Sequence, residues 1–168
     1  MASRDINDCD SRLIKIYYDF QAEMKKAGLA FILTCTARSM QEQAALFAQG
    51  RESTIDVNDL RRKAGLDLLP MVDSKGNAII YKPITWTMQS YHIVDKANIN
   101  PFMWKSRAFD IALVYPNNPK KVYYDLKVDV DNDKLPDYRE AANIGIKVGL
   151  TVGYDFKQSD PPHYQLKV

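Results

Sequence analysis

The sequence of 168 residues predicts an α+β domain in which helices flank a small antiparallel sheet. Three observations favour this class. Helix-like and strand-like segments are mixed without a regular β-α-β rhythm, short apolar segments are rich in strand-forming residues, and a polar turn separates two apolar stretches. The chain is 46% hydrophobic, with 10 Tyr, 6 Phe and 2 Trp, so residues 1–168 can bury the core of a single domain.

The first elements are a helix and a strand. Residues 11–26 predict an amphipathic helix, because apolar side chains recur three or four positions apart. These side chains are Leu13, Tyr17, Phe20 and Met24. Gly28 follows as a stop signal, since glycine readily adopts the left-handed conformation that ends helices. The apolar run 29–36 then predicts a short buried strand.

A second group of elements follows. Ser39 and Glu42 have the spacing of a capping box, which predicts the start of a short helix that ends at Gly50. Residues 56–64 predict another short helix, and the polar turn at 73–77 predicts a hairpin.

The remaining elements alternate in type. Strands are expected over residues 84–88, 107–114 and 163–168. A helix is expected over residues 137–149, with three apolar side chains on one face: Ala141, Ile144 and Val148.

Charge and composition exclude several classes. The net charge is only +2 and the longest basic run is Arg61–Lys63, which argues against a nucleic-acid-binding protein. Residues 1–12 are charged and lack an apolar core, so no signal peptide is expected, and no run is long enough for membrane insertion. Cys9 and Cys35 lie far apart and are expected to be reduced thiols.

The segment DPPH at residues 160–163 places a carboxylate near one of the two histidines of the chain. Consecutive prolines favour polyproline II, which has three residues per turn, so Asp160 and His163 are expected to face the same site. This arrangement suits a metal-bound histidine beside a general base. The alternative is a proline-rich turn in which Asp160 bonds to its own backbone.

Asp110 interrupts an otherwise apolar strand pattern. A buried carboxylate is costly unless it is paired or binds a metal. Alternation places Ala108, Asp110 and Ala112 on one face and Phe109 and Ile111 on the other, so small neighbours leave room for a site. The alternative is a strand aspartate paired with a lysine or arginine.

Two imidazoles and one carboxylate are a common ligand set for catalytic zinc. His92, Asp110 and His163 provide such a set, although the sequence contains neither H-E-x-x-H nor a cysteine cluster. Spacing alone therefore indicates a candidate zinc site and does not establish it.

Residues 129–140, DVDNDKLPDYRE, place acids at positions 1, 3, 5, 9 and 12 of a loop like that of an EF-hand. These acids are Asp129, Asp131, Asp133, Asp137 and Glu140. Calcium is a candidate ligand, although Lys134 stands where the motif has glycine. The alternative is a solvated turn in which Asp137 stabilises the start of the following helix.

Three blocks of the sequence resemble the L-alanyl-D-glutamate endopeptidases of phage endolysins, within the D-alanyl-D-alanine metallopeptidase and Hedgehog-like group. The first block is TARSMQEQAALFAQGR at residues 36–51. The second is SYH followed by SRAFDIAL, and the third is GLTVGYDF followed by SDPPHYQL. The resemblance extends over most of the chain from residue 29 onward and implies a bacteriolytic zinc metallopeptidase.

The resemblance also implies roles for individual residues. It makes His92, Asp110 and His163 the zinc ligands and Asp160 the general base. It assigns Arg38 to the substrate and to developing negative charge, for which a planar guanidinium is suited. Two further positions match residues near the substrate: Gln43 and Ser90.

The second block departs from the family pattern because residues 93–105 separate its two halves. Ser106 then stands where the family has glycine, and Asp95 is the alternative ligand if this alignment is wrong. The insert carries apolar side chains that would form either a substrate wall or the anchor of a surface loop: Phe102, Met103 and Trp104.

The implied substrate is the stem peptide of bacterial peptidoglycan, cut between L-Ala and D-Glu by a monomer. The alternatives are a D-Ala-D-Ala carboxypeptidase and a non-catalytic wall-binding or phage-tail module on the same fold. Without a signal peptide, such an endolysin would be made in the cytoplasm and reach the wall after release.

Overall fold

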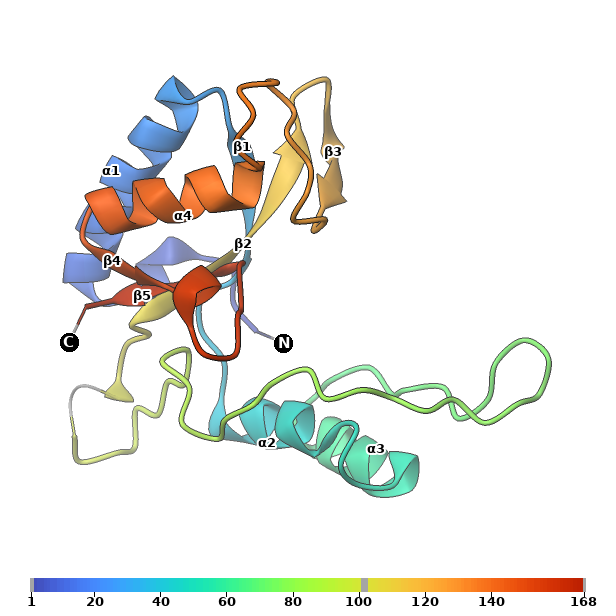
Figure 1. The fold of residues 1–168 in the computed structure, drawn as a ribbon. Coiled ribbons are helices and arrows are strands. Elements are labelled where there is room, and N and C mark those ends of the chain that lie inside the picture. The colour runs from blue at the N-terminus through green and yellow to red at the C-terminus, as the bar shows by residue number, and fades with distance from the viewer. Residues whose placement is uncertain (1, 101–102, 168) are drawn as a thin grey trace.

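The computed structural model describes residues 2–100 and 103–167. Its elements, in chain order, are η1 (Ile6–Asp8), α1 (Ser11–Lys26), β1 (Ala30–Cys35), α2 (Met40–Ala48), α3 (Thr54–Lys63), β2 (Ala108–Tyr115), β3 (Asn118–Tyr123), α4 (Asp137–Lys147), β4 (Leu150–Val152), η3 (Gly153–Asp155) and β5 (His163–Leu166). Figure 1 shows α1 and α4 packed beside the sheet, with α2 and α3 below it. The α+β class predicted from the sequence is confirmed.

Five strands form an antiparallel sheet in which β2 is central. Strand β1 pairs along one edge of β2. On the opposite edge, β5 pairs with residues 108–110 and β3 pairs with residues 113–115. Strand β4 extends the sheet beyond β5. Since β2 has neighbours on both sides, its side chains hold fixed positions relative to residues from three other strands.

A hydrophobic cluster fills the space between the sheet and the two helices α1 and α4. The ring of Phe109 on β2 stacks on Tyr164 of β5 with centroids 5.4 Å apart, and Phe20 of α1 contacts Tyr164 at 4.8 Å. Burial of each large side chain contributes about 1.5–3 kcal/mol. The predicted alternation along β2 is confirmed, because Phe109 and Ile111 enter this core and Asp110 does not.

Several predicted elements are confirmed. Helix α1 has the predicted bounds, and its four expected core residues are buried. The capping box of Ser39 and Glu42 starts α2. Helices α3 and α4 and strands β2 and β5 form where expected, with ends shifted by at most two residues. Val168, the last residue of the expected strand, lies outside the described residues.

Other expectations were wrong. Residues 84–88 form an irregular segment because they pair with no strand among the described residues. Strand β1 is only partly buried, since it lies at an edge and Ile32 is 41% exposed. Strands β3 and β4 were not predicted, because β3 is charged and mostly exposed and β4 has only three residues.

Residues 66–83 form a long arm that projects away from the sheet (Figure 1). The turn expected at 73–77 is present, and a bridge between Val72 and Ala78 closes it, but the two sides do not form a ladder. The arm returns to the body beside Gly50, whose φ is +77° and whose added Cβ would lie 2.4 Å from the nitrogen of Pro83. Glycine is therefore required where the arm meets α2.

None of the helices in the described residues is both long enough and apolar enough to span a lipid bilayer.

Candidate active site

Strand pairing places three chemically active side chains together. Asp110 on β2 lies opposite His163 on β5, and on its other side it lies opposite Cys35 on β1. His92 comes from the segment before β2, and its carbonyl accepts a hydrogen bond from the Arg38 backbone at 2.9 Å. Main-chain hydrogen bonds therefore fix the backbone positions of all these residues.

The three predicted metal ligands converge. His92 Nε2 lies 2.9 Å from Asp110 Oδ1 and 3.2 Å from His163 Nδ1, and His163 Nδ1 lies 3.0 Å from Asp110 Oδ1. Ligands held tetrahedrally at zinc–nitrogen distances of 2.0–2.1 Å are separated by about 3.3 Å. The triangle formed by these atoms therefore has the size that a zinc ion requires.

The outer nitrogen of each imidazole has a partner that fixes the ring. His92 Nδ1 donates to the carbonyl of Thr36 at 3.1 Å, and His163 Nε2 donates to Gln165 Oε1 at 2.9 Å. Because both acceptors require a proton on the outer nitrogen, the inner nitrogen of each imidazole, when the ring is neutral, directs a lone pair toward Asp110. Such a set of facing acceptors calls for a positive charge at its centre, so the donor set fits a metal.

The electrostatics lead to the same conclusion. Burial lowers the pKa of His92, but the charge of Asp110 and its hydrogen bond outweigh this effect and raise the pKa to about 10. Burial raises the pKa of Asp110, but His92 and His163 hold it well below its ordinary value. A proton on His92 and a divalent cation would thus compete for the same carboxylate.

Cys35 also lies within ligand distance of His92 and Asp110. Its Sγ is 3.6 Å from His92 Nδ1, on the side of the ring that faces away from His163. One imidazole cannot offer both nitrogens to the same ion. His163 therefore completes the ligand set better than Cys35 does. Cys35 instead contacts the outer nitrogen of the His92 ring.

Arg38 is a largely buried cation beside the carboxylate. Its Nη2 lies 3.5 Å from Asp110 Oδ2 and 3.1 Å from Cys35 Sγ, while Nη1 donates to Gln43 Oε1 at 3.3 Å. Arg38 Nε is buried and has no hydrogen-bond partner among the described residues. The guanidinium therefore engages one oxygen of Asp110 and leaves Oδ1 directed at the histidines.

Gln43 and Ser90 have different positions relative to the site. Gln43 is fully buried behind Arg38, and its Nε2 donates to Thr85 Oγ1 at 3.1 Å and to the Thr87 carbonyl at 2.5 Å. Ser90 lines the groove and accepts a hydrogen bond from the His92 backbone at 3.3 Å. Gln43 thus ties Arg38 to the segment that forms one wall of the site.

Asp160 lies on the rim of the same groove. The expected polyproline spacer is wrong: the His163 backbone N–H donates to the Asp160 carbonyl at 3.0 Å, so the two prolines lie in a hydrogen-bonded turn. The turn nevertheless directs both residues to one site. Removal of water by the surrounding protein, followed in size by the negative charge of Asp110, raises the pKa of the Asp160 carboxyl.

The groove has a volume of about 710 Å³. One wall is the segment 84–91, including Trp86 and Tyr91, and the other is the segment 156–162. The described part of the insert at 93–105 does not line it, and Phe102 lies outside the described residues. Asp95 accepts a hydrogen bond from the Ala97 backbone within the insert, so Asp110 is the carboxylate that meets His92.

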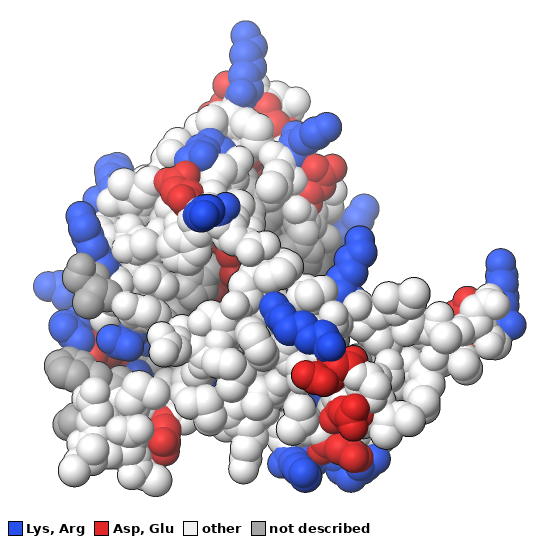
Figure 2. Space-filling model, turned by 60° about the horizontal axis from the view of Figure 1, so that its bottom comes forward, with Lys and Arg blue, Asp and Glu red and all other residues white. Residues whose placement is uncertain are grey.

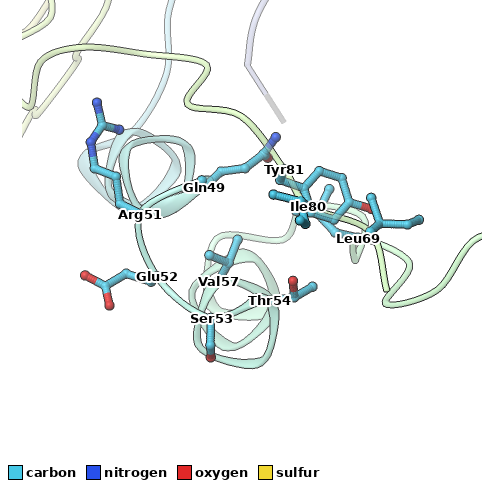
Figure 3. Close-up of a pocket in the computed structure, with 11 residues that line it drawn as sticks. Gln49, Arg51, Glu52, Ser53, Thr54, Val57, Leu69, Ile80 and Tyr81 are labelled. Carbon is cyan, nitrogen blue, oxygen red and sulfur yellow. The ribbon is translucent and has the colours of Figure 1, made fainter. Parts of the chain in front are cut away.

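A second, smaller pocket of about 260 Å³ lies between the α2–α3 junction and the arm. Figure 3 shows Tyr81, Ile80 and Leu69 of the arm on one side of it and Val57 and Thr54 of α3 on the other. It contains neither histidine and none of the predicted catalytic residues, so the groove at Asp110 is the candidate active site.

The five acids of the segment 129–140 also come together, and none of them lines the groove. They form two overlapping groups, and within each group one oxygen from every carboxylate lies within 4.8 Å of the others. The groups are Asp129 with Asp131 and Asp137, and Asp131 with Asp133 and Glu140.

The charge pattern on the face shown in Figure 2 is not typical of a polyanion-binding surface. Figure 2 shows Lys and Arg interspersed with Asp and Glu on the face it presents, without a broad area of one sign. This distribution agrees with the net charge of +2.

Gln165, Thr36 and Cys35 were not predicted as part of the site. Gln165 lies two residues after His163 on the same strand, so strand alternation places both side chains on one face. That signal was present in the sequence. The Thr36 carbonyl carried no such signal, because any residue supplies one.

No family model and no curated protein matches the chain. Among solved structures, the crystal structure of the Serratia marcescens L-Ala D-Glu endopeptidase ChiX has a similar fold, with a TM-score of 0.52. The two sequences are 14% identical, and the match covers 99% of this chain and 89% of that chain. At this identity the likeness establishes a shared fold.

Proposed function

We propose that residues 1–168 form a single zinc peptidase domain that cleaves the stem peptide of bacterial peptidoglycan between L-Ala and D-Glu. The observation that carries the proposal is the convergence of His92 Nε2, Asp110 Oδ1 and His163 Nδ1 within 2.9–3.2 Å at the groove. The similar fold of an L-Ala D-Glu endopeptidase supports the choice of bond.

The chain's own residues divide the chemistry among them. His92, Asp110 and His163 would hold zinc, which when bound polarises the scissile carbonyl and activates water. Asp160 takes a proton from the attacking water and gives it to the leaving amine, for which its raised pKa is suited. Arg38 stabilises negative charge that develops on the carbonyl oxygen.

Other residues hold these groups in place. Gln165 and the Thr36 carbonyl fix the two imidazoles, and Gln43 fixes Arg38. Ser90 and the other wall residues of the groove contact the extended peptide. Ordered partners of this kind maintain the geometry on which rate depends.

Mass spectrometry of soluble products from purified peptidoglycan, digested with zinc or with a zinc chelator, tests the proposal. Fragments with a new D-Glu amino terminus that disappear with the chelator are expected. Release of D-Ala alone would instead identify a carboxypeptidase. Absence of any product from a zinc-loaded chain would indicate a wall-binding or phage-tail module.

The role of Asp160 is tested with Asp160→Ala. This variant should bind zinc normally but turn over about 10²–10⁴-fold more slowly, the usual contribution of a general base. Asp155→Asn is the matched control, because Asp155 is a nearby exposed acid that pairs with Arg139 outside the groove. Turnover by Asp160→Ala at the normal rate would show that another group is the base.

The biological setting is also a proposal. We propose a phage lysis enzyme that acts as a monomer, is made in the host cytoplasm and reaches the wall after release. Sedimentation of the purified chain tests the monomer, and lysis of intact cells with and without membrane permeabilisation tests the route.

A further inference from the structure

The loop between β3 and α4 gathers five carboxylates that the proposed peptidase chemistry does not use. The loop runs from Asp129 to Glu140, and α4 begins at Asp137. Lys134, which replaces the glycine of an EF-hand loop, adopts φ +76°, and Asn132 adopts φ +61°. The chain thus makes the sharp turn that the motif requires without a glycine.

Two oxygens in this loop point to a ligand. Asp129 Oδ1 and Glu140 Oε2 are fully buried, and neither has a hydrogen-bond partner in the described part of the chain. They belong to the first and last positions of the motif, and the side chain of each lies in a group that includes Asp131. Buried carboxylate oxygens without partners are costly, and several close together repel one another, so a cation is the partner they lack.

Asp137 has a different role from its neighbours. It is fully buried, and its oxygens accept hydrogen bonds from the Tyr123 hydroxyl at 2.5 Å and from the Val130 backbone at 3.1 and 3.3 Å. These bonds hold the loop against the end of β3. Asp137 therefore positions the loop. One oxygen each of Asp129, Asp131 and Asp133 accepts a backbone N–H of the loop, which leaves the second oxygen of each to face an ion.

We propose that this loop binds one calcium ion through Asp129, Asp131, Asp133 and Glu140. All four ligands are carboxylates, which favours a hard cation over zinc. Calcium accepts six to eight oxygens in a flexible geometry, whereas magnesium demands near-ideal octahedral geometry and keeps several waters. A site with this many carboxylates on a curved loop suits calcium.

The site would also influence the groove. Tyr123 contacts Asp137 through its hydroxyl, and the next residue, Tyr124, lines the groove. An ion that orders the loop would therefore order the backbone that carries Tyr124. Calcium binding by the loop is independent of the peptidase proposal, because binding is measured without substrate.

Calorimetric titration of the zinc-loaded chain with calcium chloride, in buffer freed of calcium, tests the proposal. One calcium per chain and a rise in Tm of several degrees at saturation are expected. Glu140→Gln and Asp129→Asn should each weaken binding at least about tenfold. Asp125→Asn is the matched control, because Asp125 lies in the same connection but outside the acidic group, and Asn keeps the oxygen that accepts from Lys127.

Three results would overturn the proposal. The first is no heat and no change in Tm with calcium at about 1 mM, the weak end of such sites. The second is unchanged affinity in both carboxylate variants, with circular dichroism confirming that they fold. The third is magnesium binding as tightly as calcium. If one variant fails to fold, the other variant and the wild-type titration still decide the matter.

Discussion

Replacing Gly153 with alanine should disable the site although it leaves every proposed ligand unsubstituted. Gly153 begins η3, and its carbonyl accepts a hydrogen bond from the Asp160 backbone at 2.8 Å. An added Cβ would lie 2.2 Å from the Asp160 carbonyl oxygen and 2.8 Å from His163 Cβ. Both contacts are too short, so the turn that carries Asp160 and His163 must move.

The size of the effect follows from these distances. The Asp160 carbonyl must retreat by about 1 Å to reach ordinary contact, and a displacement of this size at a reacting group costs about 10²-fold in rate. Overpacking adds a loss of about 1–3 kcal/mol in folding free energy. For a chain of this length, that loss lowers the Tm by about 2–4 °C per kcal/mol.

The assay compares kcat/KM on peptidoglycan fragments, zinc affinity and Tm for two glycine variants. Gly149→Ala is the matched control, because Gly149 has φ +96° and an added Cβ there would meet nothing within 4 Å. It should lose about 1–2 kcal/mol of stability through backbone strain while kcat/KM per folded molecule stays unchanged. Wild-type kcat/KM and zinc affinity in Gly153→Ala would refute the reasoning that this glycine sets the position of the turn.

Three further predictions concern single contacts. Gln165→Leu should lower zinc affinity about 10–100-fold in a chelator competition, because His163 Nε2 loses its acceptor, whereas Gln158→Leu in the groove wall should not. In denaturant unfolding, Tyr123→Phe should lower the free energy of unfolding by about 1–3 kcal/mol, since the buried Asp137 loses a hydrogen-bond donor. Tyr164→Phe is the control and should be neutral or stabilising, because the Tyr164 hydroxyl is buried without a partner in the described residues. Hydrogen bonds from Lys147, and to a smaller extent from Lys26, lower the pKa of Glu23 to about 2. These bonds therefore stabilise the folded protein fully above the ordinary glutamate pKa, and this stabilisation is lost as the pH falls toward 2. Lys147→Gln should therefore show a shallower fall of Tm below about pH 5 than the wild type, and identical curves would contradict this assignment.

The sequence by itself determined the local structure of this protein. The spacing of Leu13, Tyr17, Phe20 and Met24 defined α1, because a helix with one apolar face has few other ways to bury it. Ser39 and Glu42 defined the start of α2 for a similarly local reason, since each satisfies a backbone group of the other. Signals of this kind depend on neighbours within a few residues and need no tertiary information.

The candidate site was only partly within reach of the sequence. Alternation along β2 placed Asp110 opposite the core side chains. His92 and His163 were candidates as the two histidines of the chain, and the resemblance to endopeptidases assigned them as ligands. The polyproline interpretation of residues 160–163 was wrong because a single backbone hydrogen bond across the prolines outweighed their extended preference. Residues 84–88 have a strand-like composition but find no strand to pair with in the described chain.

Tertiary structure alone decided how the ligands meet. The distances among His92, Asp110 and His163 follow first from the antiparallel register between β2 and β5. They follow also from the bridge between Ile93 and Arg38, which holds the segment that carries His92. Register depends on the whole sheet. The same is true of the partners that fix each imidazole and of the two buried oxygens at Asp129 and Glu140. Sequence supplies the chemical groups, whereas folding removes water around them and sets which atoms face one another, because burial and orientation are properties of the assembled chain.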